Sequence, residues 1–236
     1  MVSEELFDLV LDQDKQMLVT APLPKPEDLS KYYESESYIS HTDSRKGILP
    51  YCYQLIKKYS LQKKLKLINR LHAKKGSILD IGAGTGEFLK QAENNDWEIH
   101  GIEPNEKARE LANKKGVFLT KEIGKLTNKK FDVITLWHVL EHLPNLDEEV
   151  KKIESLLKPD GTLIIAVPNY KSYDAHFYKE YWAAYDVPRH LWHFSKESMK
   201  KLFPKNLKLI SIKPMIFDSF YVSLLSEKYK TGNHLS

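Results

Sequence analysis

Short apolar stretches alternate with stretches of helical spacing between residues 76 and 215. Apolar runs bounded by glycine or polar residues are typical of buried strands, whereas apolar residues three and four positions apart are typical of helices. This alternation predicts an α/β fold with a mostly parallel sheet covered on both faces. The expected strands lie near 77–81, 97–102, 117–120, 131–137, 162–167 and 207–214, and the expected helices near 87–95, 105–115, 147–157 and 196–203.

The chain on either side of this region follows other patterns. Residues 7–20 alternate apolar and polar positions, which indicates a hairpin, and three prolines in 21–28 indicate an extended linker. Apolar spacing over 48–75 predicts a long or broken helix, and 217–230 reads as another. We therefore expect four parts: an N-terminal hairpin and linker extension over 1–40, a helical segment over 41–75, a main domain over 76–215, and a C-terminal helix and tail over 216–236.

A glycine-rich turn is the most informative motif. Residues 80–86 read Asp-Ile-Gly-Ala-Gly-Thr-Gly and lie between a predicted strand and a predicted helix. Glycine takes positive φ and, lacking a Cβ, lets a ligand lie against the backbone. Glu103 closes the next predicted strand, where its two oxygens can accept both hydroxyls of a ribose. Together these residues predict a site for a nucleoside cofactor.

Asp80 bears on which cofactor binds. A dinucleotide site has the spacing G-x-G-x-x-G and presents helix N–H groups to a pyrophosphate, which a carboxylate at the same turn would repel. Here the spacing is G-x-G-x-G with an acid two residues ahead. S-adenosylmethionine carries an ammonium and a sulfonium and no phosphate, so the charge argument favours it over NAD.

On these residues the chain resembles the class I methyltransferases that use S-adenosylmethionine. Residues 80–86 look like their first motif, Glu103 like their ribose-binding acid, 131–134 like their fourth strand and 157–163 like the lead into their fifth. Residues 138–142 and 186–191 look most like small bacterial methyltransferases related to the ubiquinone-biosynthesis O-methyltransferases. The resemblance covers about residues 76–215.

The resemblance implies a Rossmann-like, doubly wound sheet flanked by helices, and it also exposes a departure. The family's sheet ends with an antiparallel seventh strand, which we do not find after Ile212. Either the chain is cut short or that edge is covered differently, and an uncovered edge would favour a homodimer.

Composition narrows the function classes. No run of 18 apolar residues is present and the N-terminus is acidic, so we expect a soluble, cytoplasmic protein with no membrane span. Cys52 is the only cysteine, which excludes an intramolecular disulfide and a multi-cysteine zinc module. The net charge of +4 comes almost entirely from scattered lysines, so we expect no nucleic-acid partner.

Methyl transfer is an in-line displacement that depends mainly on positioning, and a base matters only for an acceptor that is protonated at neutral pH. His138, Glu141 and His142 follow the fourth predicted strand, at the sheet edge where ligands bind. The same letters match the zinc motif H-x-x-E-H, but that motif needs a sustained helix, and here a strand precedes it and Pro144 follows. We therefore expect no metal; for Glu141 and His142, capping and packing of the turn stays an open alternative.

A second cluster lies in an aromatic insert over 169–194, between the fifth predicted strand and the next helix. The insert either covers a planar or lipid-like acceptor or packs against its own domain. His190 is our preferred base and Arg189 an anchor for an acidic group of the acceptor. The candidate residues are catalytic His190, His138, Glu141 and His142; cofactor-binding Asp80, Gly82, Ala83, Gly84, Gly86, Glu103, Pro104, Trp137 and His138; and substrate-binding Tyr181, Trp182, Arg189 and Trp192.

These features predict an enzyme that moves a methyl group from S-adenosylmethionine to a small or lipid-like acceptor at oxygen. Two alternatives stay open. One is a non-catalytic protein of the same fold that serves as a binding or assembly partner, and the other is a nicotinamide oxidoreductase, which Asp80 and the glycine spacing disfavour.

Overall fold

The computed structural model describes residues 5–33, 48–126, 129–203 and 207–232. The chain divides into two compact units. We call Lys46–Leu140 with Leu146–Ala166 the sheet unit, and Met1–Arg45 with Glu141–Asn145 and Val167–Ser236 the hairpin unit.

The sheet unit is built on four parallel strands in the order β4-β3-β5-β6. The strands are β3 (Ser77–Ile81), β4 (Glu98–Ile102), β5 (Phe131–Trp137) and β6 (Leu157–Ala166). Chain order is reversed beside β3, which pairs with β4 on one side and with β5 on the other. This is the strand arrangement expected of a doubly wound α/β fold, in which ligands bind beyond the carboxyl ends of the strands.

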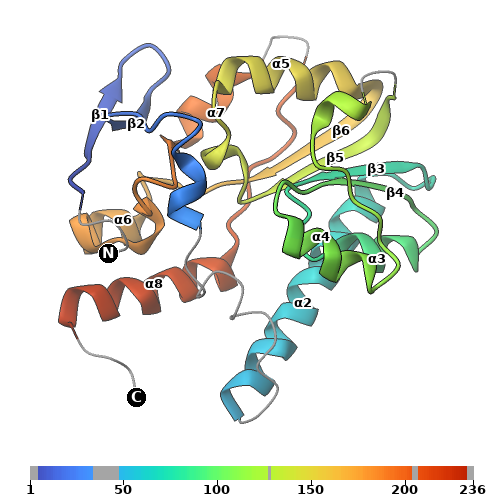
Figure 1. Ribbon diagram of the computed structural model, residues 1–236, viewed down its shortest axis with the longest axis horizontal. Coiled ribbons are helices and arrows are strands. Elements are labelled where there is room, and N and C mark those ends of the chain that lie inside the picture. Colours follow the sequence, from blue (N-terminus) through green and yellow to red (C-terminus); the bar gives the residue numbers. More distant parts are fainter. Residues whose placement is uncertain (1–4, 34–47, 127–128, 204–206, 233–236) are drawn as a thin grey trace. The chain divides into compact units, whose positions relative to one another are not determined.

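Helices cover both faces of this sheet. They are α2 (Ile48–Leu71), α3 (Glu87–Glu93), α4 (Glu106–Asn113) and α5 (Leu146–Leu156). Figure 1 shows α5 on one face and α3 and α4 on the other. Strand β3 is buried along its whole length because it lies between two strands and two helical layers. Its apolar side chains join those of α2, α3 and α4 in one core that includes Ile68, Leu89 and Trp97.

Two of the predicted strands are wrong. Residues 117–120 contribute only a single bridge, between Thr120 and Ile102; Val117 is buried in the core, but Phe118 is 80% exposed, so the segment does not pair along its length as a strand. Residues 207–214 form no strand; Leu209, Ile210 and Ile212 stay exposed, so the burial that stabilises a strand is missing there.

The hairpin unit contains a second, smaller sheet. Strands β1 (Asp8–Asp12) and β2 (Met17–Ala21) form the predicted hairpin, and β2 also pairs with β7 (Trp192–His193). The sequence pattern did not predict this second pairing, in which Leu18 lies opposite His193 and Val19 opposite Trp192. Thus the N-terminal hairpin fixes the end of the aromatic insert within one sheet.

Helices make up most of the rest of this unit, and all but the last are short. They are η1 (Leu29–Tyr33), α6 (Tyr173–Tyr178), η4 (Lys179–Tyr181), η5 (Ala183–Tyr185), α7 (Lys196–Leu202) and α8 (Ile216–Thr231). Of two further short helices, η3 (Leu140–His142) spans the point where the chain passes from the sheet unit to the hairpin unit, and η2 (Ile123–Leu126) belongs to the sheet unit. The C-terminal helix is confirmed within one residue of its predicted limits. It is anchored by Ser226, whose hydroxyl donates to Val222 O and accepts from Ala183 N, both at 2.8 Å. No helix among the described residues has the length and apolar content needed to cross a bilayer.

Candidate functional site

The glycine turn follows β3 directly and has the conformation that its sequence predicts. Gly82, Gly84 and Gly86 have φ values of 72°, 54° and 72°, in the left-handed region. The backbone N–H groups of Gly82 and Ala83 donate to Ile102 O at 2.8 and 2.9 Å, which joins the turn to the end of β4. A Cβ on Gly84 would meet nothing within 4 Å, so the backbone there is open to a ligand.

Glu103 is held against this turn by backbone amides. Its Oε2 accepts a hydrogen bond from Gly84 N and its Oε1 from Asn105 N, each at 2.8 Å. The side chain is buried, with 9% of the residue exposed. Each carboxylate oxygen accepts more than one hydrogen bond, so both keep capacity for a ligand hydroxyl. The exposed Pro104 follows it, before the N-cap Asn105 of α4.

Asp80 is buried beneath the turn, with 3% exposed. Its Oδ1 accepts a hydrogen bond from Thr135 Oγ1 at 2.5 Å. Burial raises the pKa of Asp80 to about 7, against the opposing effects of the Thr135 hydrogen bond and the positive charge of Lys64; the negative charge of Glu103 adds to the rise. A cationic ligand near this carboxylate would therefore favour its ionised form near neutral pH.

Sequence reasoning missed two of these partners. Thr135 was visible as the polar residue within the apolar run of β5, opposite Asp80 in the sheet register. Lys64 lies on α2 and carried no signal, because one lysine among many on a helix reads as solvated surface. Its Nζ lies 4.4 Å from the centre of the Trp137 ring, a cation–π contact at the end of β5.

Trp137 and His138 lie where the sequence places them, at the carboxyl end of β5. The Trp137 ring meets Phe88 edge-on at 5.8 Å, and its buried Nε1 has no hydrogen-bond partner in the part of the chain that the structure describes. His138 has a φ of 59° and donates its backbone N–H to Ala166 O at 2.9 Å. Residues 138–142 therefore do not form the sustained helix that an H-x-x-E-H zinc site requires.

A second group of candidates comes together in the hairpin unit. Glu141, His142 and His190 each offer a ligand-type atom, and these atoms all lie within 4.8 Å of one another. The two imidazole rings are 4.5 Å apart between centroids. Hydrogen bonds hold the two segments side by side: Leu191 N donates to Glu141 O at 2.8 Å, and Trp192 Nε1 donates to Leu143 O at 2.7 Å.

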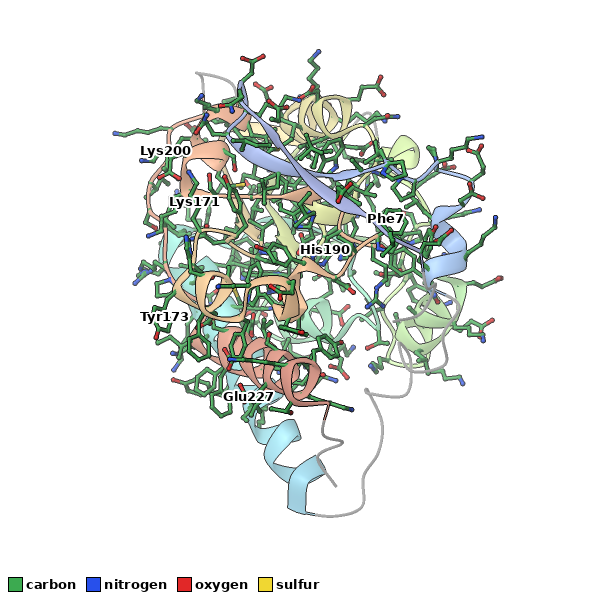
Figure 2. All side chains as sticks on the ribbon, turned by 90° about the vertical axis from the view of Figure 1, so that its left-hand side faces the viewer. Phe7, Lys171, Tyr173, His190, Lys200 and Glu227 are labelled. Atoms are coloured by element: carbon green, nitrogen blue, oxygen red, sulfur yellow. The ribbon has the colours of Figure 1, made fainter. Side chains whose placement is uncertain are left out.

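Other parts of the unit support both histidines. The backbone O of His190 accepts from Thr20 Oγ1 at 2.6 Å, and its Nδ1 lies 2.9 Å from Ala184 O, so the hairpin and η5 both hold it. His142 Nδ1 lies 3.0 Å from Arg189 O and 2.9 Å from Tyr33 Oη. His190, which is labelled in Figure 2, is buried, with an exposed fraction of 8%.

The predicted acceptor-binding residues differ in exposure and in the contacts they make within this unit. Arg189 donates to Asp186 Oδ1 from Nε at 3.1 Å and from Nη2 at 2.5 Å, so a carboxylate of the chain already uses its guanidinium. Burial raises the pKa of Asp186, and the hydrogen bond from Arg189 opposes that rise. Trp182 is 5% exposed and belongs to the small core of the insert, whereas Tyr181 is 42% exposed.

Comparison with known proteins decides the family. The methyltransferase domain family matches residues 53–207, which include the glycine turn, Glu103 and the cluster around His190. The chain belongs to this family. The expected methyltransferase family and α/β fold are confirmed.

Individual relatives match only part of this methyltransferase. An uncharacterized methyltransferase of Anoxybacillus flavithermus is 32% identical over 108 residues, which are 42% of this chain and 51% of the relative. A ubiquinone biosynthesis O-methyltransferase of Haemophilus ducreyi is 32% identical over 115 residues, 43% of this chain and 48% of the relative. The chain spans about half the length of the curated relatives it matches.

Solved structures agree on the fold. The plantazolicin methyltransferase in complex with S-adenosylhomocysteine (SAH) is similar with a TM-score of 0.55 and 15% identity, covering 88% of this chain and 90% of that one. The magnesium protoporphyrin IX methyltransferase of Synechocystis, also with bound SAH, has a TM-score of 0.54 and 16% identity, covering 75% and 86%. At such identities the likeness concerns the fold alone.

Proposed function

We propose that this chain transfers the methyl group of S-adenosylmethionine to an oxygen atom of a small or lipid-like acceptor. An O–C bond forms as the C–S bond breaks, the sulfonium becomes the neutral thioether of SAH, and the acceptor hydroxyl loses its proton. The observation that carries the proposal is the pairing of Glu103 with the glycine turn, inside a region that matches the methyltransferase domain family. Positioning supplies most of the acceleration in such an in-line displacement.

The cofactor roles follow from the sheet unit. The backbone of the glycine turn would lie against the cofactor at Gly82, Ala83, Gly84 and Gly86. Glu103 would accept hydrogen bonds from the hydroxyls of its ribose. Asp80 supplies negative charge beneath the turn, which suits the ammonium group. Pro104, Trp137 and His138 would border the cofactor because they stand at the carboxyl ends of β4 and β5.

The acceptor class is supported by the names of relatives and by the aromatic insert. The Haemophilus ducreyi relative acts in ubiquinone biosynthesis as an O-methyltransferase, and a Lactobacillus johnsonii relative, 32% identical over 111 residues, is a demethylmenaquinone methyltransferase. The insert offers exposed aromatic side chains, including Tyr173 and Tyr181. We therefore propose a hydroxylated aromatic acceptor, with Tyr181, Trp182, Arg189 and Trp192 as candidate contacts.

A phenolic hydroxyl is protonated at neutral pH, so this acceptor needs a group that takes up its proton. His190 is our candidate base. Its Nδ1 lies within hydrogen-bond distance of a backbone carbonyl, which can only accept, so Nδ1 carries the proton and Nε2 keeps its lone pair. Glu141 and His142 lie beside His190 and are candidates to assist the proton transfer. His138, the fourth candidate, precedes Glu141 by three residues in the chain.

Calorimetric titration with SAH tests the cofactor assignment, with NAD as the negative control. Glu103→Ala should weaken SAH binding about tenfold to hundredfold, corresponding to roughly 1 to 3 kcal/mol for leaving hydrogen-bonding groups unmatched. Glu110→Ala is the matched control, because Glu110 is an exposed acid on α4, the helix that follows Glu103; this variant should bind SAH as the parent does.

Transfer of a labelled methyl group to a panel of catechols, phenols and sugars then tests the acceptor class. Turnover with the hydroxylated aromatics and not with the sugars is the expected result. SAH binding without transfer to any hydroxyl acceptor would contradict the oxygen assignment, and a folded protein that binds no SAH would contradict the enzyme itself.

A further inference from the structure

The cluster of Glu141, His142 and His190 has the composition of a metal site. One carboxylate and two imidazoles, with ligand-type atoms within 4.8 Å of one another, form a donor set that binds Zn²⁺ and similar ions. Glu141 is fully buried, and both of its carboxylate oxygens are enclosed. The letters H-x-x-E-H would pair His138 with His142 on one helix; the structure instead brings His190 beside Glu141 and His142.

The hydrogen bonds around the two imidazoles leave the right nitrogen for a metal. His190 Nδ1 lies 2.9 Å from Ala184 O and His142 Nδ1 lies 3.0 Å from Arg189 O. A carbonyl oxygen only accepts, so these two contacts assign the proton of each ring to Nδ1 and make Nε2 the nitrogen that could bind a metal. Histidines that bind metals are commonly oriented by such a bond from the other ring nitrogen.

The charges nearby also suit a cation. Asp186 lies close enough for Glu141 and His142 to influence its carboxyl, and its Oδ2 is 3.8 Å from His190 Nε2, beyond hydrogen-bond distance. The neighbouring guanidinium of Arg189 is held by Asp186 Oδ1. A second carboxyl group therefore lies beside the His190 imidazole.

We propose that Glu141, His142 and His190 bind one divalent transition-metal ion of the Zn²⁺ type. Tetrahedral ligands at about 2.0–2.2 Å from zinc lie roughly 3.4 Å from one another, so the three atoms approach by about 1.4 Å at most, through side-chain rotation. Three protein ligands leave one position for an oxygen donor. Under the proposed function, on which this last step rests, a bound ion would lower the pKa of an acceptor hydroxyl at that position, so that the proton passes to solvent water before transfer. The ion would then take the place of His190 as the group that activates the acceptor, because the Nε2 lone pair of His190 binds the ion.

Metal binding is measured directly on the full chain without a histidine tag. The protein is stripped by dialysis against a chelator and titrated with Zn²⁺ by calorimetry, and its metal content is determined by mass spectrometry. The expected result is one equivalent of Zn²⁺, with the affinity lowered at least tenfold by each of Glu141→Gln, His142→Asn and His190→Asn. His176→Asn is the matched control, because His176 is exposed on α6 and its loss should leave binding unchanged.

Titration with SAH and circular dichroism establish that each variant is folded and separate the two proposals. A folded chain that binds SAH but less than 0.1 equivalent of Zn²⁺ overturns the metal site and leaves the methyltransferase proposal intact. Zinc binding that survives all three substitutions together also overturns it. A chain that binds Zn²⁺ at this cluster but no SAH supports the metal site and contradicts the proposed function.

Discussion

The burial of Asp80 predicts that S-adenosylmethionine binding is coupled to the loss of a proton. With a pKa of about 7, the carboxyl is largely neutral in the free protein at pH 5.5 and half ionised at pH 7. An ammonium ligand interacts with the ionised form, so the cofactor has to displace the proton in acid. The experiment therefore varies the pH. The variant Asp80→Asn removes the titratable carboxyl group and keeps an oxygen that accepts the hydrogen bond from Thr135.

The expected magnitude follows from the ionised fraction. About 3% of Asp80 is ionised at pH 5.5 and about 50% at pH 7, so the affinity should rise roughly tenfold to twentyfold between them, which corresponds to about 1 to 2 kcal/mol. Between pH 5.5 and 7 the ammonium group of the cofactor stays largely charged, because α-amino groups titrate at roughly 7.7–8.0. The same shift affects folding. A raised carboxyl pKa gives stability that is complete below pH 3.8 and is lost as pH rises through 7, by about 4 kcal/mol.

Calorimetry in buffers of different ionisation enthalpy measures both the affinity and the number of protons released. Asp80→Asn should bind more weakly at pH 7, with a pH slope near zero, and should be more stable than the parent at pH 8. Asp132→Asn is the control: burial raises the pKa of Asp132, but its hydrogen bonds with Lys158 and Ser77 outweigh this and hold it below its usual range, so it stays ionised throughout. Equal affinity of the parent at pH 5.5 and 7, with no proton released, would refute the reasoning.

Three further predictions concern the two units separately. Gly82→Ala should lower the free energy of unfolding by more than Gly84→Ala. Both variants lose about 1 to 2 kcal/mol because alanine is strained at a left-handed φ, but only Gly82→Ala also places a Cβ 2.3 Å from Val139 Cγ2. Urea unfolding compares the two variants, and equal losses of stability would contradict this steric overlap. Ser226→Ala should cost about 1 to 3 kcal/mol, because a backbone N–H loses its acceptor, and an unchanged melting temperature would argue against that anchor. Burial lowers the pKa of His193 to about 4, so the protein should lose about 3 kcal/mol as pH falls from 6.5 to 4, a loss that acid unfolding should find absent in His193→Gln.

Much of the fold could be predicted because the sheet is buried and its strands are uninterrupted. Strands β3 and β5 have the predicted limits, since each is an apolar run with a clear boundary. Strand β6 begins at Leu157, earlier than expected, because Pro159 and Gly161 read as a turn although the backbone is already extended there. The two-residue strand β7 is too short for any periodicity, so its pairing with the hairpin had no sequence signal.

The candidate functional residues also divide into those with a clear sequence signal and those without one. Glu103 and the glycines could be predicted because they follow strands, where chain order alone determines which ends meet. Glu141, His142 and His190 are each candidates on the sequence, but their proximity could not be predicted, since no spacing relates residues that far apart in the sequence. Main-chain hydrogen bonds, such as that from Leu191 N to Glu141 O, bring the two segments together. Because the backbone makes that contact, Gln and Asn substitutions at the three side chains should leave the segments paired, and whatever function they lose is then assigned to the carboxylate and imidazole groups themselves.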